Sequence, residues 1–380
     1  MQSHFRSARR RIGGIAVALV AAVGIGALVA PAAASAKPKN VKVMTRNIYL
    51  GADLTPALLA ESPQEMFAAA GAIYDTSVFG TNFRGRAELL ADEIARAKPD
   101  AIGLQEVALW RRGPLDSVTA DPTPAREVVI DFLEVLQTQL AKRGLNYKVG
   151  KVQNEADLEV PIDRDADGTP EFDGRLTMRD AILVKGNLKV SKRRGGNYAS
   201  LLPVPTPLGS ISVTRGWTAV DLTKGKKRNA KKFRFVNTHL EAFSAFFRAN
   251  QAQALRSLGL ISNSGRLPVI LVGDLNSDPV DDSEQTLPNA PFPPTAQNAA
   301  YLTIEAAGFV DRGVTVNTCC HADDLLNPEP EFGSRIDHVL SKGRVTKLGA
   351  SLTGADPELR TNTGLWPADH GGVVSRLRIR

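Results

Sequence analysis

The segment Val269–Ser277, VILVGDLNS, joins four large apolar residues to a polar ending that contains Asp274 and Asn276. A short run of Val, Ile and Leu that stops at Gly and Asp has the length and composition of a buried β-strand. The polar ending alone is typical of a turn, because Asp and Asn bond locally to the backbone. The segment therefore predicts a core strand whose last residues present a carboxylate and an amide.

The same arrangement recurs along the chain. Further strand-like runs adjoin Asn47, Glu106, His239 and Asp337, each of which carries a carboxylate, amide or imidazole group. Residues at strand ends gather along one edge of a sheet, so a single site built from these side chains is expected. The predicted strands are Val41–Met44, Ala101–Leu104, Ala181–Val184, Ser212–Val220, Phe233–Thr238, Val269–Val272 and His338–Leu340.

Longer segments with helical spacing of apolar residues lie between some of these runs. They are Arg84–Ala97, Glu127–Arg143 and Phe246–Leu260. Helices that alternate with strands favour a layered α/β domain over an all-β or an all-helical one.

The side chains at the strand ends are mostly oxygen donors. Hard divalent cations such as Mg²⁺ prefer oxygen ligands, usually one or two carboxylates with water and substrate phosphate. The chain has no cysteine cluster and no two histidines at helical spacing, so a zinc protease site is not supported. His239 and His370 stand within acid and amide clusters, where they suit proton transfer and charge stabilisation.

Six segments, in this order, resemble the signature blocks of the endonuclease/exonuclease/phosphatase family. They are Thr45–Ile48, Gln105–Glu106, Asn237–Leu240, Gly273–Ser277, Ser334–Val339 and Ala368–Gly371. They cover nearly the whole chain after the N-terminal segment. The resemblance implies a DNase I-like fold, a four-layered α/β sandwich of two packed mixed sheets flanked by helices. It also implies hydrolysis of phosphoester bonds with Mg²⁺ or Mn²⁺ as cofactor.

The resemblance implies a metal-binding set as well. Glu106 is expected as the main metal ligand, with Asn47 assisting it and Asp369 reaching the metal region. Asp274 and Asn276 complete the expected set.

The same resemblance implies catalytic roles. Asp274 would position or deprotonate the attacking water, and Asn276 would hold the scissile phosphate. His370, oriented by Asp337, would act as base or stabilise the pentacovalent phosphorus. His239 would donate to a non-bridging oxygen and stabilise developing charge. Which of Asp274 and His370 is the formal base stays open.

Two parts of the chain depart from the family pattern. Arg179 and Asp180 match a family position that usually contacts the substrate phosphate through a small polar residue. The family often has Asn or Gly there, so Asp180 is unusual. Ala368 replaces the usual Ser before Asp369, and Gly371 follows His370 where a larger residue is common. Arg179 and Asp180 are nevertheless expected to contact the phosphate.

The N-terminus has the three-part plan of a secretory signal peptide. Arg9–Arg11 precede an apolar run from Ile12 to Ala30, and Ala34–Ala36 form a small-residue cleavage site. Residues 1–36 are predicted to be removed, and residues 37–380 to form the enzymatic domain of a secreted protein. The alternative is an uncleaved membrane anchor. The choice between the Sec and the twin-arginine route stays open.

Removal of the predicted signal takes away four arginines and no acidic residue, so the formal net charge falls from +7 to +3. The remaining basic bias is local, in Lys192–Arg194 and in the run from Lys224 to Lys232. Such runs are typical of solvated loops, although they also attract polyanions such as nucleic acid.

The only two cysteines, Cys319 and Cys320, are adjacent, so they do not form the disulfide framework of a small secreted domain. Three states are open: two free buried thiols, a vicinal disulfide, or a metal site with His321.

Asp163, Asp165, Asp167 and Gly168 have the spacing of a calcium-binding loop. Gly174 stands where an EF-hand requires its bidentate Glu. A structural Ca²⁺ at the three acids is one prediction, and a solvated acidic loop is the other.

The substrate is less determined than the chemistry. A nuclease is slightly favoured by the basic runs, so nucleic acid is the first expected partner. A sphingomyelinase-like phospholipase C acting on a phospholipid head group is the alternative. Phe243, Phe246 and Phe247 would then form either a lipid-facing rim or the buried face of a short helix. The third candidate is a non-catalytic extracellular binding protein on the same fold. A monomer without a stable protein partner is expected.

Overall fold

The computed structural model describes residues 40–120, 122–226, 230–259, 267–286 and 292–379, which belong to one unit, Pro38–Arg380. The predicted signal peptide, residues 1–36, lies outside the described residues. Within the described part, no helix is both long and apolar enough to cross a membrane.

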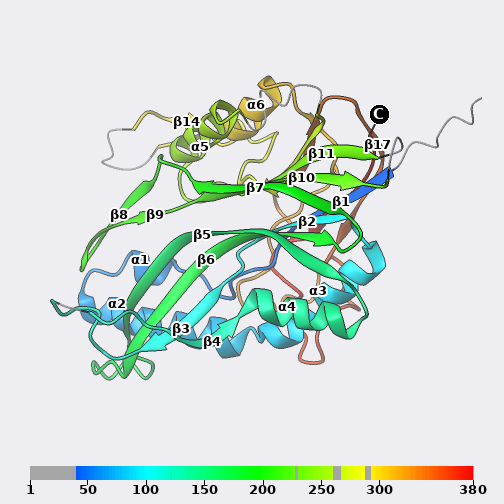
Figure 1. Cartoon of the computed structure of the whole chain (residues 1–380). Coiled ribbons are helices and arrows are strands. Elements are labelled where there is room, and N and C mark those ends of the chain that lie inside the picture. The colour runs from blue at the N-terminus through cyan, green and yellow to red at the C-terminus, as the bar shows by residue number, and fades with distance from the viewer. Residues whose placement is uncertain (1–39, 121, 227–229, 260–266, 287–291, 380) are drawn as a thin grey trace, which may run out of the picture. The chain divides into compact units, whose positions relative to one another are not determined.

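Two mixed β-sheets form the centre of this unit (Figure 1). In the first sheet the strand order is β17-β18-β1-β2-β6-β3-β4, with β5 also paired to β6. β1 and β2 are parallel, and the other pairs are antiparallel. The strands are β1 (Asn40–Asn47), β2 (Ala101–Gln105), β3 (Leu109–Gly113), β4 (Glu127–Asp131), β5 (Tyr147–Ile162), β6 (Phe172–Lys185), β17 (Val345–Thr353) and β18 (Gly372–Ile379).

The second sheet has the order β15-β16-β12-β11-β10-β7. Only β11 and β12 run parallel among its described pairs. The strands are β7 (Lys189–Asn197), β10 (Gly216–Lys224), β11 (Lys231–His239), β12 (Val269–Asp274), β15 (Val310–Asp311) and β16 (Asp337–Lys342).

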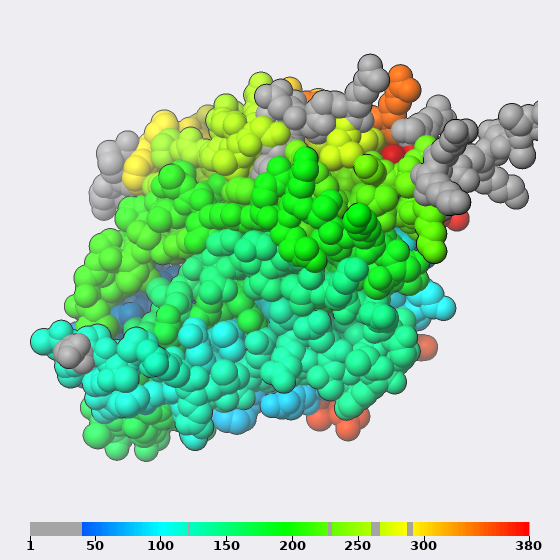
Figure 2. All heavy atoms as spheres, viewed as in Figure 1, coloured from blue at the N-terminus to red at the C-terminus, as the bar shows by residue number. Residues whose placement is uncertain are grey.

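Two small hairpins stand apart from these sheets: β8 (Leu202–Thr206) with β9 (Gly209–Val213), and β13 (Glu284–Gln285) with β14 (Thr295–Ala296). The β8–β9 hairpin lies on the same side as helix α1, and the surface is hollowed between them (Figure 2). The helices are α1 (Thr55–Leu58), α2 (Pro63–Asp75) followed by a π-helical turn (Thr76–Gly80), α3 (Phe83–Ala97), α4 (Phe132–Lys142), α5 (Ala245–Ser257) and α6 (Ala299–Ala306).

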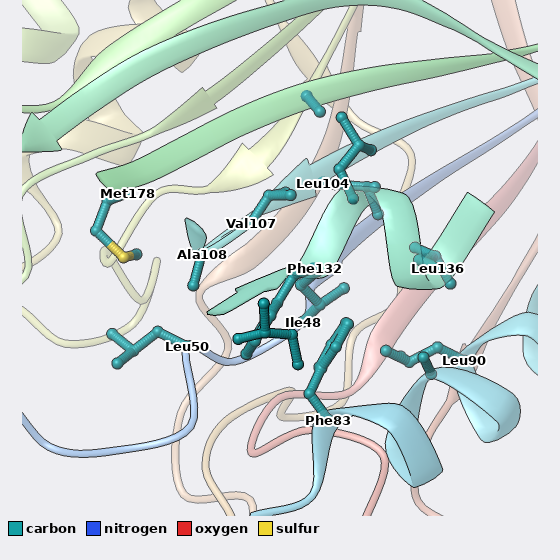
Figure 3. Packing of buried hydrophobic residues seen from close by; sticks show 14 of the residues in the cluster. Ile48, Leu50, Phe83, Leu90, Leu104, Val107, Ala108, Phe132, Leu136 and Met178 are labelled. Atoms are coloured by element: carbon teal, nitrogen blue, oxygen red, sulfur yellow. The ribbon is translucent and has the colours of Figure 1, made fainter. Parts of the chain in front are cut away.

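Alternation of apolar residues explains the layers. In β12, Ile270 and Val272 point to the first sheet, whereas Val269 and Leu271 point to the opposite face. The inner faces of the two sheets therefore share one core, and α5 and α6 cover the outer face of the second sheet. Helices α2, α3 and α4 cover the outer face of the first, where the rings of Phe83 and Phe132 stack (Figure 3). The predicted four-layered α/β sandwich is confirmed.

Two predicted elements were wrong in their bounds. The segment Glu127–Arg143 was predicted as one helix, but its first residues form β4. The β-branched run Val128–Ile130 favours a strand, and the Asp131 carboxylate then caps α4 by accepting from the amides of Leu133 and Glu134.

The segment Ser212–Val220 was predicted as one strand, but it is divided between β9 and β10. The chain leaves the small hairpin at Val213 and enters the second sheet at Gly216. Arg215 lies at this crossing, and its side chain turns into the site described below.

Candidate active site

The register of the strands brings the predicted side chains together. Asn47 lies beside Gln105 across β1 and β2, and His239 lies beside Asp274 across β11 and β12. Asp274 also faces Asp337, the first residue of β16. Gly273 is required at this point, because a Cβ there would lie 2.0 Å from the carbonyl oxygen of Thr238.

Asn47 links the two sheets at the site. Its Nδ2 donates to Glu106 Oε1 at 3.0 Å and to Asp274 Oδ2 at 3.1 Å. The amide of Leu50 holds the other Glu106 oxygen at 2.8 Å. Asn47 thus meets the carboxylates through its nitrogen, which fits a role in orienting the ligands better than direct binding of a cation.

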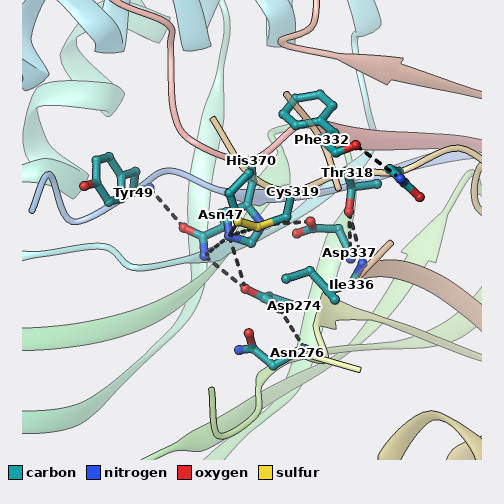
Figure 4. Close-up of a disulfide and its surroundings, with 12 residues drawn as sticks. Asn47, Tyr49, Asp274, Asn276, Thr318, Cys319, Phe332, Ile336, Asp337 and His370 are labelled. Carbon is teal, nitrogen blue, oxygen red and sulfur yellow. Dashed lines mark hydrogen bonds and ion pairs between the residues drawn. A yellow bond between two sulfur atoms is a disulfide. The ribbon is translucent and has the colours of Figure 1, made fainter. Parts of the chain in front are cut away.

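His370 and Asp337 form a buried pair (Figure 4). Asp337 Oδ2 lies 2.8 Å from His370 Nδ1, and His370 Nε2 lies 3.7 Å from Asp274 Oδ2. Burial lowers the pKa of His370, but the carboxylates of Asp337, Asp369 and Asp274 outweigh it and raise this pKa well above its usual value. The imidazole is therefore held in its charged form between two carboxylates.

His239 has the opposite protonation state. Burial, followed by the positive charges of Arg215 and His370, lowers its pKa well below the usual value. An Arg215 guanidinium nitrogen lies 3.2 Å from His239 Nδ1, and a guanidinium can only donate. His239 therefore carries its proton on Nε2, which lies 3.5 Å from Asp274 Oδ2 and can donate to an oxygen in the site.

Asn276 and Asp369 complete the group. Asn276 lies on a left-handed turn, φ 48°, where its amide N–H donates to Asp274 Oδ1 at 2.9 Å. Its side-chain Nδ2 donates to the carbonyl of Leu240 at 3.0 Å. Oδ1 of Asp369 is buried without a hydrogen-bond partner in the described part of the chain.

The acids of the site fit a hard divalent cation. Burial raises the pKa of Asp369 to about 7, and the charges of Glu106 and Asp274 act in the same direction. Burial likewise raises the pKa of Asp274 to about 6, supported by Asp337. A cation beside Glu106 and Asp369 would offset this repulsion and give the unpartnered Asp369 oxygen a ligand role.

Arg179 does not fit its predicted role. Its guanidinium pairs with both oxygens of Asp131, at 2.6 and 3.1 Å, and also donates to the carbonyls of Val107 and Ala108. The side chain is thus used to fix the segment after Glu106 against the start of α4. Arg179 does not line the cavity among the described residues, so its predicted contact with the substrate phosphate is not supported.

Asp180 is buried beside His239 and Glu155, with one oxygen of each carboxylate and one His239 nitrogen within 4.8 Å of one another. Its Oδ2 accepts from Asn237 Nδ2 at 3.3 Å. Asp180 is absent from the described residues that line the cavity. Its carboxylate lies beside His239, so the predicted contact of Asp180 with the substrate phosphate is not supported.

The adjacent cysteines form a vicinal disulfide in the structure (Figure 4). Their sulfur atoms lie 3.5 and 4.0 Å from His370 Nε2. His321 instead stacks on Trp366 and faces Asn327, so the predicted alternative of a metal site with His321 is not supported.

The predicted calcium loop also gathers its acids. One oxygen each of Asp163, Asp165 and Asp167 lie within 4.8 Å of one another. The amide of Gly168 donates to Asp163 Oδ2 at 2.9 Å.

One cavity of about 470 Å³ collects the groups of the site. It is lined by Glu106, His239, Asp274, Asn276, Asp369 and His370. Its volume is that of a small-molecule site.

Arg215, Glu155 and Glu241 are functional candidates that the sequence reasoning missed. Arg215 lines the cavity, and Glu155 and Glu241 lie near enough to help raise its pKa against the lowering effect of burial. A lone arginine that interrupts a predicted strand, Ser212–Val220, was the one available signal.

Comparison with known proteins agrees with this geometry. Residues 77–370 match the model of the Endonuclease/Exonuclease/phosphatase family. A search of curated proteins finds no match.

Solved structures of the same family have a similar fold. A family protein from Bacteroides thetaiotaomicron has a TM-score of 0.52 at 16% identity, covering 90% of this chain and 99% of its own. One from Bacteroides vulgatus has a TM-score of 0.50 at 16% identity, covering 90% and 100%. One from Leptotrichia buccalis has a TM-score of 0.50 at 15% identity, covering 89% and 100%.

The family match extends over more than half of the chain and includes Glu106, His239, Asp274, Asp337 and His370. These are the residues that meet in the cavity and behind it. The chain belongs to the endonuclease/exonuclease/phosphatase family.

Proposed function

We propose that the protein is a divalent-metal-dependent phosphoesterase. A water oxygen attacks phosphorus, the ester P–O bond breaks, and the leaving oxygen takes up a proton. The observation that carries the proposal is the buried Asp337–His370 pair, which faces Asp274 and Glu106 in one cavity. Nuclease and phosphatase chemistry, the activities in the family's name, both consist of such a displacement.

The carboxylates of Asp337 and Asp274 beside His370 favour different roles for His370 and Asp274. With Asp337 at Nδ1 and Asp274 near Nε2, the imidazole is held protonated and is unsuited to accept a further proton. Asp274 is then the acceptor for the proton of the attacking water. His370 would donate its Nε2 proton to the leaving oxygen as the ester bond breaks, and His239 would donate a hydrogen bond from Nε2 to a non-bridging oxygen.

Glu106 and Asp369 would hold the metal ion, with Asn47 orienting Glu106. Bound Mg²⁺ or Mn²⁺ would polarise the phosphoryl oxygen and neutralise developing charge. Asn276, whose side chain lines the cavity, would position the phosphate.

We expect EDTA to abolish turnover and Mg²⁺ to restore it. We further expect Glu106→Gln to need at least about tenfold more Mg²⁺ for half-maximal rate, because a charged oxygen ligand is lost. The measurement is the rate of hydrolysis of bis(p-nitrophenyl) phosphate against Mg²⁺ concentration. Mn²⁺ binding, followed by the EPR signal of the free ion, gives a readout independent of turnover.

Glu305→Gln is the matched control, since Glu305 lies exposed on α6. It should leave both curves unchanged. Full turnover of the wild-type protein in EDTA would contradict metal dependence.

The basic run lies far from the reaction centre. Lys224 and Lys231 pair at one end of the β10–β11 hairpin, and Gly216 and His239 pair at the other. Eight residue steps of a strand separate the two ends by roughly 27 Å. Lys227 and Arg228 of this run lie outside the described residues. The substrate class is therefore better argued from the residues that line the catalytic cavity and its neighbourhood.

We also propose a structural Ca²⁺ at Asp163, Asp165 and Asp167. Asp163 is 2% exposed, and its Oδ1 is buried without a hydrogen-bond partner in the described part of the chain. The loop packs on α2, where the amide of Asp163 donates to the carbonyl of Phe67 at 3.3 Å. A cation would compensate the buried charge and fix the end of the β5–β6 hairpin.

Calorimetric titration with Ca²⁺ in excess Mg²⁺ tests this site. We expect binding by the wild-type protein, with a rise in Tm, and loss of both in Asp165→Ala. Asp282→Ala, which removes another exposed acid, should bind as the wild type does. An unchanged isotherm for Asp165→Ala would dismiss the site.

Export as a monomeric enzyme belongs to the same proposal and rests on the signal pattern of residues 1–36. A non-catalytic binding protein is the less favoured alternative, because Glu106, His239, Asp274, Asn276, Asp369 and His370 line one cavity and Asp337 supports His370.

A further inference from the structure

A second cavity, of about 380 Å³, adjoins the catalytic one. Both cavities are lined by Leu54, Leu58, Leu158 and Ile211, so they meet along a shared apolar wall. The hollow between the β8–β9 hairpin and the α1 region marks this part of the surface (Figure 2).

The walls of the second cavity are almost wholly apolar. Its deeper lining includes Ile73 from α2, Trp110 from β3 and Leu176 from β6. Among its described polar lining residues, Glu159 is already engaged, since its Oε1 accepts from the amide of Ala125 at 2.7 Å. Water gains few hydrogen bonds in such a space, whereas hydrocarbon is favoured there.

The catalytic cavity has both polar and apolar lining. It is lined by Glu106, Asp274 and His370, and its apolar residues include Leu50 and Met178 besides the four shared with the second cavity. A bound molecule could therefore keep its phosphate at the acids and run an apolar tail from one cavity into the next.

The mouth of the second cavity exposes large apolar side chains. Leu208, in the turn of the β8–β9 hairpin, is 44% exposed, and Val118 is 57% exposed. An exposed apolar rim beside an apolar cavity is typical of a site that meets a hydrophobic ligand. Phe243, which is 40% exposed, lines the catalytic cavity, whereas Phe247 is buried in α5.

We propose that the second cavity binds the hydrocarbon chain of the substrate, so that the enzyme acts on phosphoesters of lipid type rather than on nucleic acid. This inference rests on the proposed phosphoesterase function. It assigns the acyl or alkyl chain to the cavity between α1, α2, β6 and the β8–β9 hairpin.

The test is a chain-length series of p-nitrophenyl phosphodiesters that carry a methyl, butyl or octyl group, used below the micellar concentration. Burial of one methylene is worth up to about fourfold in binding, so kcat/KM should rise at least about thirtyfold from methyl to octyl. A p-nitrophenyl ester of thymidine phosphate is the nucleic-acid arm and should react more slowly than the octyl ester.

Leu208→Glu places a charge at the mouth and should lower kcat/KM for the octyl ester about tenfold or more, while the methyl ester reacts as before. Leu302→Glu is the matched control, because Leu302 on α6 has the same 44% exposure. Val118→Glu provides a second test, matched by Val128→Glu at 55% exposure on β4. All four positions are at the surface, where such changes leave the fold intact.

Equal kcat/KM for the methyl and octyl esters, or a faster thymidine ester, would overturn the inference and leave the phosphoesterase standing. If no ester is cleaved, the proposed function fails, and calorimetry with dodecyl phosphate in EDTA decides the cavity alone. Binding that Leu208→Glu weakens would then support the inference, and absence of binding to the wild type would refute it.

Discussion

Asp274→Asn is expected to lower kcat by about 10²–10⁴-fold, with little change in KM, because it removes the group that accepts the proton of the attacking water. The carboxylate is 1% exposed and lies at the centre of the site. Its Oδ2 is 3.1 Å from Asn47 Nδ2, 3.5 Å from His239 Nε2 and 3.7 Å from His370 Nε2.

The substitution keeps the size of the side chain, and the amide oxygen can still accept from the backbone of Asn276, as Asp274 Oδ1 does at 2.9 Å. The amide nitrogen then faces Asn47 Nδ2 and His239 Nε2, which are both donors, so some loss of stability is expected. Tm is therefore measured beside kcat, and the variant should remain folded at the assay temperature.

Stopped-flow and steady-state rates with bis(p-nitrophenyl) phosphate measure the effect. Asp282→Asn, at an exposed position five residues beyond the turn of Asn276 and Ser277, is the matched control and should keep the wild-type rate. A kcat within threefold of wild type for Asp274→Asn would exclude this carboxylate as the base.

The parts of the site that could be predicted from the sequence are those whose signal is local. Val269–Asp274 reads as a buried strand with a polar end, and the structure confirms the strand. That Asp274 meets His239 and Asp337 follows from strand order in the sheet, which apolar periodicity does not specify. Here the resemblance to a family supplied what local patterns could not.

Arg179 and Arg215 show the limit of that reasoning. Both are arginines near predicted strands, yet one pairs with Asp131 at the start of α4 and the other reaches His239. Which partner each finds depends on a helix cap and on a crossing between two hairpins, both of which are tertiary. The apolar cavity could not be predicted from the sequence either, because Leu54, Leu158 and Ile211 come from distant segments of the chain.

The second prediction with a large expected effect on kcat concerns His370 and Asp337. His370→Ala should lower kcat at least about a hundredfold, since the donor to the developing charge is lost. Asp337→Asn should lower it by about tenfold or more, because the amide no longer holds the imidazole charged. In the described part of the chain, Asp337 Oδ1 has no hydrogen-bond partner and Oδ2 contacts His370, so Asp337 is a positioning residue.

A double-mutant cycle separates positioning from an independent role. If Asp337 acts through His370, the double variant should be no slower than His370→Ala alone, within about threefold. Asp311→Asn is the matched control, because Asp311 lies 3.4 Å from Nδ1 of another histidine, His338, whose imidazole is buried behind the site. It should alter Tm without the same loss of kcat. If the two losses in kcat multiply in the double variant, Asp337 acts on the metal or the substrate independently of His370. The role assigned to the protonated imidazole would then be wrong.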